Sequence, residues 1–89
     1  MEFMLPGSPI YQLKLKDISD TGAGAIVNPQ SKLLGMVRVG QELRVRLVVP
    51  RGSGFRAGSY RGRITQITEL VDGAYKGHLL VGVALSPEG

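Results

Sequence analysis

Apolar and polar residues alternate with a period of two over several segments of this 89-residue chain, most clearly in residues 10–16 and 41–49. Successive side chains of a β-strand point to opposite faces of the sheet, so this alternation predicts strands with one face on a core. The apolar positions of the two segments are Tyr11, Leu13, Leu15, Leu43, Val45, Leu47 and Val49.

Two further segments predict strands with a local irregularity. Residues 23–27 are small and apolar, and Gly24 within them permits a bulge or a close approach by another chain segment or a ligand. Residues 60–70 alternate imperfectly, because Ile64 and Ile67 are three positions apart. That spacing predicts a bulge or a strong twist in the strand.

Residues rich in Gly, Pro, Ser and Asn separate these segments and predict turns and loops. The pair Asn28-Pro29 ends a strand, because proline cannot donate to a sheet ladder. The pattern does not decide whether residues 32–34 form a helical turn. Residues 50–59 predict a loop, and its Phe55 either folds back on the barrel or faces a partner.

The last predicted strand, residues 75–85, is bulged or bent near its glycines and follows a hairpin turn at Asp72-Gly73. Five or six strands with short connections can close on themselves and so remove their exposed edges. The predicted fold class is therefore all-β, a small antiparallel β-barrel of about six strands over residues 10–89. Residues 1–9 show no pattern and predict an irregular arm or a linker.

Composition excludes several functions. Cysteine is absent, so disulfides, thiolate chemistry and cysteine-bound zinc are excluded, which is consistent with a reducing cytoplasm. No apolar run approaches the length of a membrane-spanning helix. His78 is the only histidine, and no nucleophile lies near it in the sequence. We therefore favour a structural role for His78 over a catalytic one. We expect a cytoplasmic protein that is not an enzyme, with no catalytic residue, no metal site and no cofactor.

The net charge of +4 is unevenly distributed along the chain. Residues 28–63 hold eight basic residues and one acidic residue, a net +7, whereas the rest of the chain has a net −3. A basic middle favours anionic ligands or partners, and a solvated rim of strand and loop charges is the alternative. Four arginines in two i, i+2 pairs each share a predicted strand face and are auxiliary binding candidates: Arg44, Arg46, Arg61 and Arg63.

A polar stretch, residues 17–22, joins the first two predicted strands. Asp and Ser bond nearby backbone donors, and Gly tolerates positive φ, so a tight turn explains the stretch by itself. The alternative is functional, because a carboxylate, a hydroxyl and bare backbone together can hydrogen-bond a flat polar ligand such as a nucleobase.

The pattern Asp-x-Ser-x-x-Gly in that stretch resembles the second sequence motif of PilZ domains, small β-barrel receptors for the bacterial second messenger cyclic di-GMP. Three further stretches follow in the order expected of that family. They are Gly22-Ala23-Gly24-Ala25-Ile26-Val27, Val39-Gly40-Gln41-Glu42-Leu43 and Val81-Gly82-Val83-Ala84-Leu85. The resemblance covers about residues 10–85, and it selects a PilZ barrel from the small barrels that periodicity alone does not separate.

The resemblance implies that Asp17 and Ser19 bond a guanine edge of cyclic di-GMP and that Gly22 lets the backbone come close to it. PilZ receptors also carry an Arg-x-x-x-Arg arm upstream of this motif. Residues 1–16 contain no arginine, and no two arginines of the chain are four positions apart. We therefore predict weak or absent cyclic di-GMP binding by this chain. Either the arm lies upstream in a longer protein, or the domain has diverged.

Three functions are compatible with these observations. The leading one is a PilZ-type receptor or adaptor domain in cyclic di-GMP signalling, which controls motility, polysaccharide export or a similar behaviour through a protein partner or further domains. The second is a ligand-independent protein-interaction barrel. The third, a nucleic-acid-binding barrel that uses residues 38–63, is disfavoured because the chain's five aromatic residues show no interleaved pattern for base stacking.

Overall fold

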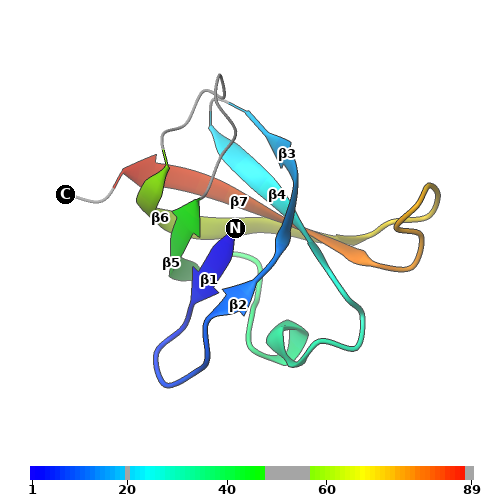
Figure 1. The fold of residues 1–89 in the computed structure, drawn as a ribbon, viewed down its shortest axis with the longest axis horizontal. Helices are drawn as coiled ribbons and strands as arrows, with labels where there is room; N and C mark the ends of the chain where they lie inside the picture. Colours follow the sequence, from blue (N-terminus) through cyan, green and yellow to red (C-terminus); the bar gives the residue numbers. More distant parts are fainter. Residues whose placement is uncertain (20, 48–56, 88–89) are drawn as a thin grey trace.

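The computed structural model describes residues 1–19, 21–47 and 57–87 of the chain (Figure 1). These residues form seven β-strands and one short 3₁₀ helix, which confirms the predicted all-β class. The elements in chain order are β1 (Glu2–Met4), β2 (Tyr11–Gln12), β3 (Lys14–Ile18), β4 (Gly22–Val27), η1 (Lys32–Gly35), β5 (Glu42–Leu47), β6 (Gly58–Glu69) and β7 (Leu79–Pro87).

The described strands form one antiparallel sheet in the order β2-β1-β5-β6-β7-β4-β3. β2 and β3 stand at opposite ends of that order, yet only Leu13 separates them in the chain. The sheet therefore curls until its two ends meet in one continuous segment. In Figure 1, β1 and β5 lie in front, and the long strands β6 and β7 cross behind them. The small antiparallel barrel is confirmed, with seven strands in place of about six.

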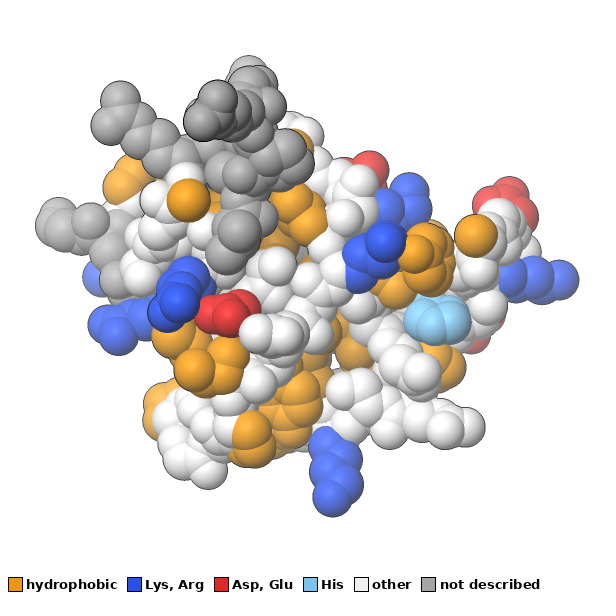
Figure 2. Space-filling view, in the orientation of Figure 1, with side chains coloured by type: hydrophobic (Ala, Val, Ile, Leu, Met, Phe, Trp, Pro, Cys, Tyr) orange, Lys and Arg blue, Asp and Glu red, His pale blue; other side chains and the backbone are white. Residues whose placement is uncertain are grey.

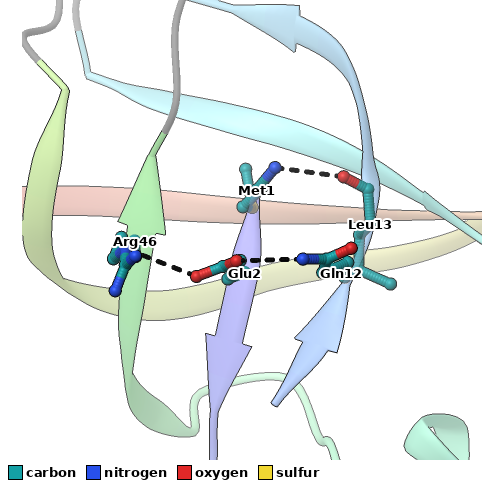
Figure 3. A network of polar contacts seen from close by, with 5 residues as sticks. All are labelled: Met1, Glu2, Gln12, Leu13 and Arg46. Atoms are coloured by element: carbon teal, nitrogen blue, oxygen red, sulfur yellow. Dashed lines mark hydrogen bonds and ion pairs between the residues drawn. The ribbon is translucent and has the colours of Figure 1, made fainter.

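Backbone hydrogen bonds at Leu13 extend the β1–β2 pairing to the residue at which the chain passes from β2 to β3 (Figure 3). The Leu13 amide donates to the Met1 carbonyl at 2.7 Å, and the Met1 nitrogen donates to the Leu13 carbonyl at 3.1 Å. Next to this pair, Gln12 Nε2 donates to the Glu2 carboxylate at 3.2 Å, and Arg46 Nε of β5 lies 3.4 Å from the other carboxylate oxygen. Glu2 thus connects β1 to the strands on both of its sides.

β1 is where the structure departs most from the sequence prediction. The sequence predicts an irregular arm or linker over residues 1–9, but Glu2–Met4 pairs with β2 on one side and β5 on the other. Phe3 lies opposite Val45 and has no exposed surface. The prediction is wrong for this segment because three residues are too short to display an alternation that periodicity could detect.

The barrel interior is apolar and draws on every part of the ring. Phe3, Val45, Ile64 and Val81 are fully buried and come from four different strands. Leu33 of η1 is buried in the same cluster, so the connection between β4 and β5 contributes to the core. The helical turn that the sequence left open is therefore present as η1.

Two β-bulges interrupt the alternation of the strands. In β6 the register shifts between Ile64 and Gln66, so that Ile64 and Ile67 both contact the core. This confirms the bulge predicted from their spacing. A second register shift in β3, between Leu15 and Asp17, is not predicted by the sequence analysis.

The predicted turn at residues 17–22 is shorter in the structure. β3 continues to Ile18 and β4 begins at Gly22, so Asp17 belongs to a strand. The strand continues because Ile18 still pairs with Ala23 across the hairpin. Asp20 lies outside the described residues.

The connection between β6 and β7 is longer than the predicted two-residue hairpin turn. The closing strand begins at Leu79 and not at residue 75. Gly73 and Gly77 both adopt positive φ, 82° and 88°, and each reverses the backbone locally. The connection therefore contains two backbone reversals, at Gly73 and Gly77, where the sequence predicts one hairpin turn. Residues 50–56 of the predicted 50–59 loop, which include Phe55, lie outside the described residues.

We expect Phe3→Ala to destabilise the protein by about 3–5 kcal/mol, because it removes a fully buried ring and leaves a cavity. Urea unfolding followed by circular dichroism measures this change. Ile10→Ala is the matched control, since Ile10 is 56% exposed and its truncation should change stability by less than about 0.5 kcal/mol. Equal effects of the two substitutions would contradict the placement of β1 in the core.

Candidate functional site

A groove of about 280 Å³ lies across four strands of the barrel. Its lining comes from β3, β4, β6 and β7 and from the turn that joins β3 to β4. Gly24 of β4 and Gly82 of β7 pair directly with each other and form a floor of bare backbone. We call this site the glycine groove. Its remaining lining includes Asp17, Ser19, Gly22, Thr65, Gln66, Leu80 and Ala84.

Both bulges of the barrel lie opposite the floor of the glycine groove. The β6 bulge places Thr65 and Gln66 opposite Gly82. The β3 bulge places Lys16 and Asp17 opposite Gly24. A bulge sets two residues opposite one and redirects a side chain, and bulges are common beside functional sites. The two paired glycines are therefore flanked on both sides by redirected polar side chains.

The walls stand so close that any floor side chain would fill the groove. A Cβ on Gly82 would lie 2.8 Å from Gln66 Cγ and 3.1 Å from Thr65 Oγ1. A Cβ on Gly24 would lie 3.0 Å from a Leu80 methyl carbon and 3.7 Å from an Asp17 carboxylate oxygen. The groove exists because both floor residues are glycine.

The three residues that the sequence predicts for ligand binding come together at this groove. Asp17 forms part of one wall, with its side chain 63% exposed and 3.9 Å from the Lys16 ammonium group. Ser19 and Gly22 line the end of the groove at the β3–β4 turn. Their grouping agrees with the predicted site, while their role in binding a ligand stays a prediction.

Ser19 has two long hydrogen bonds within the turn. Its hydroxyl donates to the Gly22 carbonyl at 3.4 Å and accepts from the Thr21 amide at 3.4 Å. Both exceed the usual range for bonds of this kind. The turn itself is held by the shorter bond from the Ser19 amide to the Gly22 carbonyl, at 2.9 Å. The hydroxyl can therefore turn toward a ligand without opening the turn.

Gly22 has a packing reason to be glycine in addition to the predicted one. A Cβ at this position would collide with the backbone carbonyl of Val83 on β7. Backbone cannot move aside as a flexible side chain does, so β4 and β7 would have to separate. The sequence analysis assigns Gly22 to ligand approach, but the pairing of the two strands requires glycine by itself.

The four auxiliary arginines are not equivalent. None of the four is part of the groove lining, and Arg46 is directed toward Glu2 on β1. Arg63 is nearer, because it pairs across the sheet with the groove residue Ala84. Its guanidinium lies 2.8 Å from the Glu42 carboxylate on β5.

Arg63 lowers the pKa of Glu42 below its ordinary value, mainly through their hydrogen bond and then through its charge. A depressed pKa in the folded state means that the pair stabilises the fold at neutral pH. This stabilisation is lost as pH falls through the lowered pKa. Because Arg63 and Glu42 are 62% and 52% exposed, water and salt screen the pair and its contribution is small.

Two other features of the described residues do not belong to the groove. The His78 ring packs edge-on against Tyr75 at 5.7 Å, and its Nδ1 atom is buried without a hydrogen-bond partner among the described residues. A wider hollow of about 450 Å³ lies beside it, and its lining includes Lys14, Lys16 and Tyr75. None of the predicted binding residues Asp17, Ser19 and Gly22 lines that hollow.

The described part of the chain has no group of three or more potential metal-ligating side chains close enough to hold an ion. Within the same residues, no helix has the length and apolar character needed to cross a bilayer.

Sequence reasoning did not assign Thr65, Gln66 or Gly82 to a site. Thr65 and Gln66 were hidden because a bulge can be predicted from Ile64 and Ile67 without showing which side chains it redirects. The sequence predicts a bulge or bend near Gly82, and the structure places a bulge of β6 opposite Gly82, which also pairs with Gly24. The available signal was the occurrence of glycine inside two predicted strands, Gly24 in residues 23–27 and Gly82 in residues 75–85, and only the register brings these two together.

Comparisons with protein-family models, with curated proteins and with solved structures find no match to this chain. The resemblance to PilZ domains therefore stays a prediction.

We expect Gly22→Ala to destabilise the protein by about 1–3 kcal/mol, because the new methyl group collides with β7 backbone. Gly35→Ala is the matched control: nothing lies within 4 Å of its Cβ position, so the change should be within about 1 kcal/mol and favourable. Urea denaturation of both variants tests this. A stable Gly22→Ala protein would show that β4 and β7 pair less closely than described.

The Glu42 pKa should rise toward its ordinary value of 4.5 in Arg63→Gln, because the substitution removes the hydrogen bond and the charge that lower it. An NMR titration of the Glu42 carboxyl carbon measures the shift. Arg61→Gln should raise the pKa less, since Arg61 is the weakest cause of the lowering. A pKa that responds equally to both variants would mean that the ion pair does not form in solution.

Proposed function

We propose that the glycine groove binds a guanine base of cyclic di-GMP and that the chain is a receptor or adaptor domain of PilZ type. The observation that carries this proposal is the convergence of Asp17, Ser19 and Gly22 on one groove whose floor is two paired glycines. These three residues are the ones that the family resemblance implies. The resemblance comes from sequence order, whereas the glycine floor beside these three residues comes from the register of β4 against β7, so the floor is a separate support.

The groove offers the chemistry that a guanine needs. A planar ring that enters the groove meets two residues without side chains, Gly24 and Gly82, between walls that Leu80, Thr65 and Gln66 form. Guanine presents amino-group donors on one edge and the O6 and N7 acceptors on another. The Asp17 carboxylate accepts hydrogen bonds, and the Gln66 amide donates them. The two side chains stand on opposite walls and so suit opposite edges of one ring.

The size of the groove limits what it holds. Its volume of about 280 Å³ lies just below the range of about 300–1,000 Å³ that is usual for small-molecule sites. That is room for one base rather than for a whole cyclic dinucleotide. The phosphates and the second guanine of the ligand would therefore lie outside the groove, on the barrel surface.

The absence of arginine from residues 1–16 should make the affinity low. Each charge-assisted hydrogen bond contributes about 1.5–3 kcal/mol, so two missing contacts weaken binding by about 3–6 kcal/mol. That difference corresponds to roughly 10²- to 10⁴-fold in the dissociation constant. A micromolar receptor would then bind on the order of 1 mM.

We expect cyclic di-GMP to shift the amide NMR signals of Gly22, Gly24 and Gly82 with a dissociation constant on the order of 1 mM. Asp17→Ala should weaken this binding by at least about tenfold, because it removes a charged acceptor. Asp72→Ala is the matched control, since Asp72 is another exposed aspartate and lies outside the groove. It should leave the binding unchanged.

Three outcomes would contradict parts of the proposal. Saturable micromolar binding would show that other residues replace the arginine arm. Shifts confined to residues outside the groove would remove the groove from the site. Unchanged spectra at several times the expected dissociation constant would reject ligand binding and leave the protein-interaction barrel as the function to pursue.

A further inference from the structure

Four residues lie in register across the outer face of the barrel and lead to the glycine groove. Glu42 of β5 pairs with Arg63 of β6, Arg63 pairs with Ala84 of β7, and Ala84 pairs with Gly22 of β4. Directly opposed residues of an antiparallel sheet project their side chains to the same face. Arg63 therefore stands one strand away from the groove on one side and one strand away from Glu42 on the other.

The side chains between Arg63 and the groove are too small to block it. Ala84 contributes one methyl group, and Gly22 contributes none. The Arg63 guanidinium already spans one strand spacing, about 4.8 Å, to reach Glu42. The same extension in the opposite direction carries it over Ala84, which lines the groove one strand away from Gly22.

We propose that Arg63 binds a phosphate of the groove ligand, and that Glu42 holds Arg63 away from the groove until that phosphate arrives. This proposal rests on the proposed function, because it assigns the anionic part of the same ligand. The groove has room for one base, so the phosphates lie outside it, where the Arg63–Ala84–Gly22 row begins. A guanidinium binds phosphate through two parallel hydrogen bonds, which makes phosphate a strong competitor for a carboxylate partner.

Glu42 is suited to this role because its pair with Arg63 is accessible. Both side chains are more than half exposed, so an incoming anion can displace the carboxylate without opening the core. The Arg46–Glu2 pair on the neighbouring strands differs in position. Arg46 pairs with Ser59 and Glu2, neither of which lines the groove.

The register also separates Arg63 from its neighbour on β6. Arg61 shares the outer face but lies opposite Ser86, which is not a groove residue. The two arginines carry the same charge two residues apart. A general attraction between basic residues and an anion would therefore act through both, whereas a specific contact acts through Arg63 alone.

The test measures cyclic di-GMP and guanosine binding by amide NMR titration of four variants. Arg63→Gln should weaken cyclic di-GMP binding by about tenfold and leave guanosine, which lacks phosphate, unchanged. Glu42→Gln should tighten cyclic di-GMP binding several-fold, because Arg63 no longer has a competing carboxylate. Arg61→Gln and Glu2→Gln are the matched controls for charge and for loss of an ion pair. Both should change binding by less than about twofold.

Each contrary result has a distinct meaning. If Asp17→Ala abolishes binding but Arg63→Gln does not weaken it, the Arg63 proposal is overturned and the proposed function stands. If Glu2→Gln tightens binding as much as Glu42→Gln, the effect is general electrostatics and the proposal is again overturned. If neither the wild-type chain nor Glu42→Gln binds cyclic di-GMP or guanosine, both proposals are overturned.

Discussion

Closure of the sheet at Leu13 is the constraint on which the rest of the barrel depends. Leu13 exchanges two backbone hydrogen bonds with Met1, and on either side of it the chain pairs with different strands, β1 before and β4 after. A curled sheet that closes has no long free edge to expose unpaired backbone groups. β3 leaves this point to pair with β4, and that pairing brings Asp17 to the wall of the glycine groove.

The glycine groove illustrates how a small barrel can form a site without a large cavity. Four neighbouring strands would normally present a continuous surface of side chains. Two opposed glycines, Gly24 and Gly82, leave this surface without side chains at its centre. Two bulges direct polar side chains toward the space that remains. The core is not disturbed, because Ile64 and Ile67 of β6, and Leu15 and Ile18 of β3, all contact it from either side of the bulges. The two bulges therefore belong both to the barrel and to the lining of the groove.

The charges of the chain are arranged differently in space than in sequence. Residues 28–63 carry a net +7, yet β1 brings Glu2 to Arg46, and Glu42 lies beside Arg63. Figure 2 accordingly shows the basic side chains of this face in separate groups, with a carboxylate against one of them over β1 and β5. Positive charge is therefore presented at individual positions, and register decides which of them can reach the groove.

The sequence by itself determined the all-β class, most strand positions, the irregularity of β6 and the grouping of Asp17, Ser19 and Gly22 around one turn. These are local properties, since alternation, turn residues and motif spacing act over a few neighbouring positions. Only the tertiary structure decided that residues 2–4 form a strand, and that Gly82 pairs with Gly24. It also decided which arginine stands beside the groove. Each of these depends on the register between segments that are distant in the chain, and register is set by closure of the whole barrel around one core.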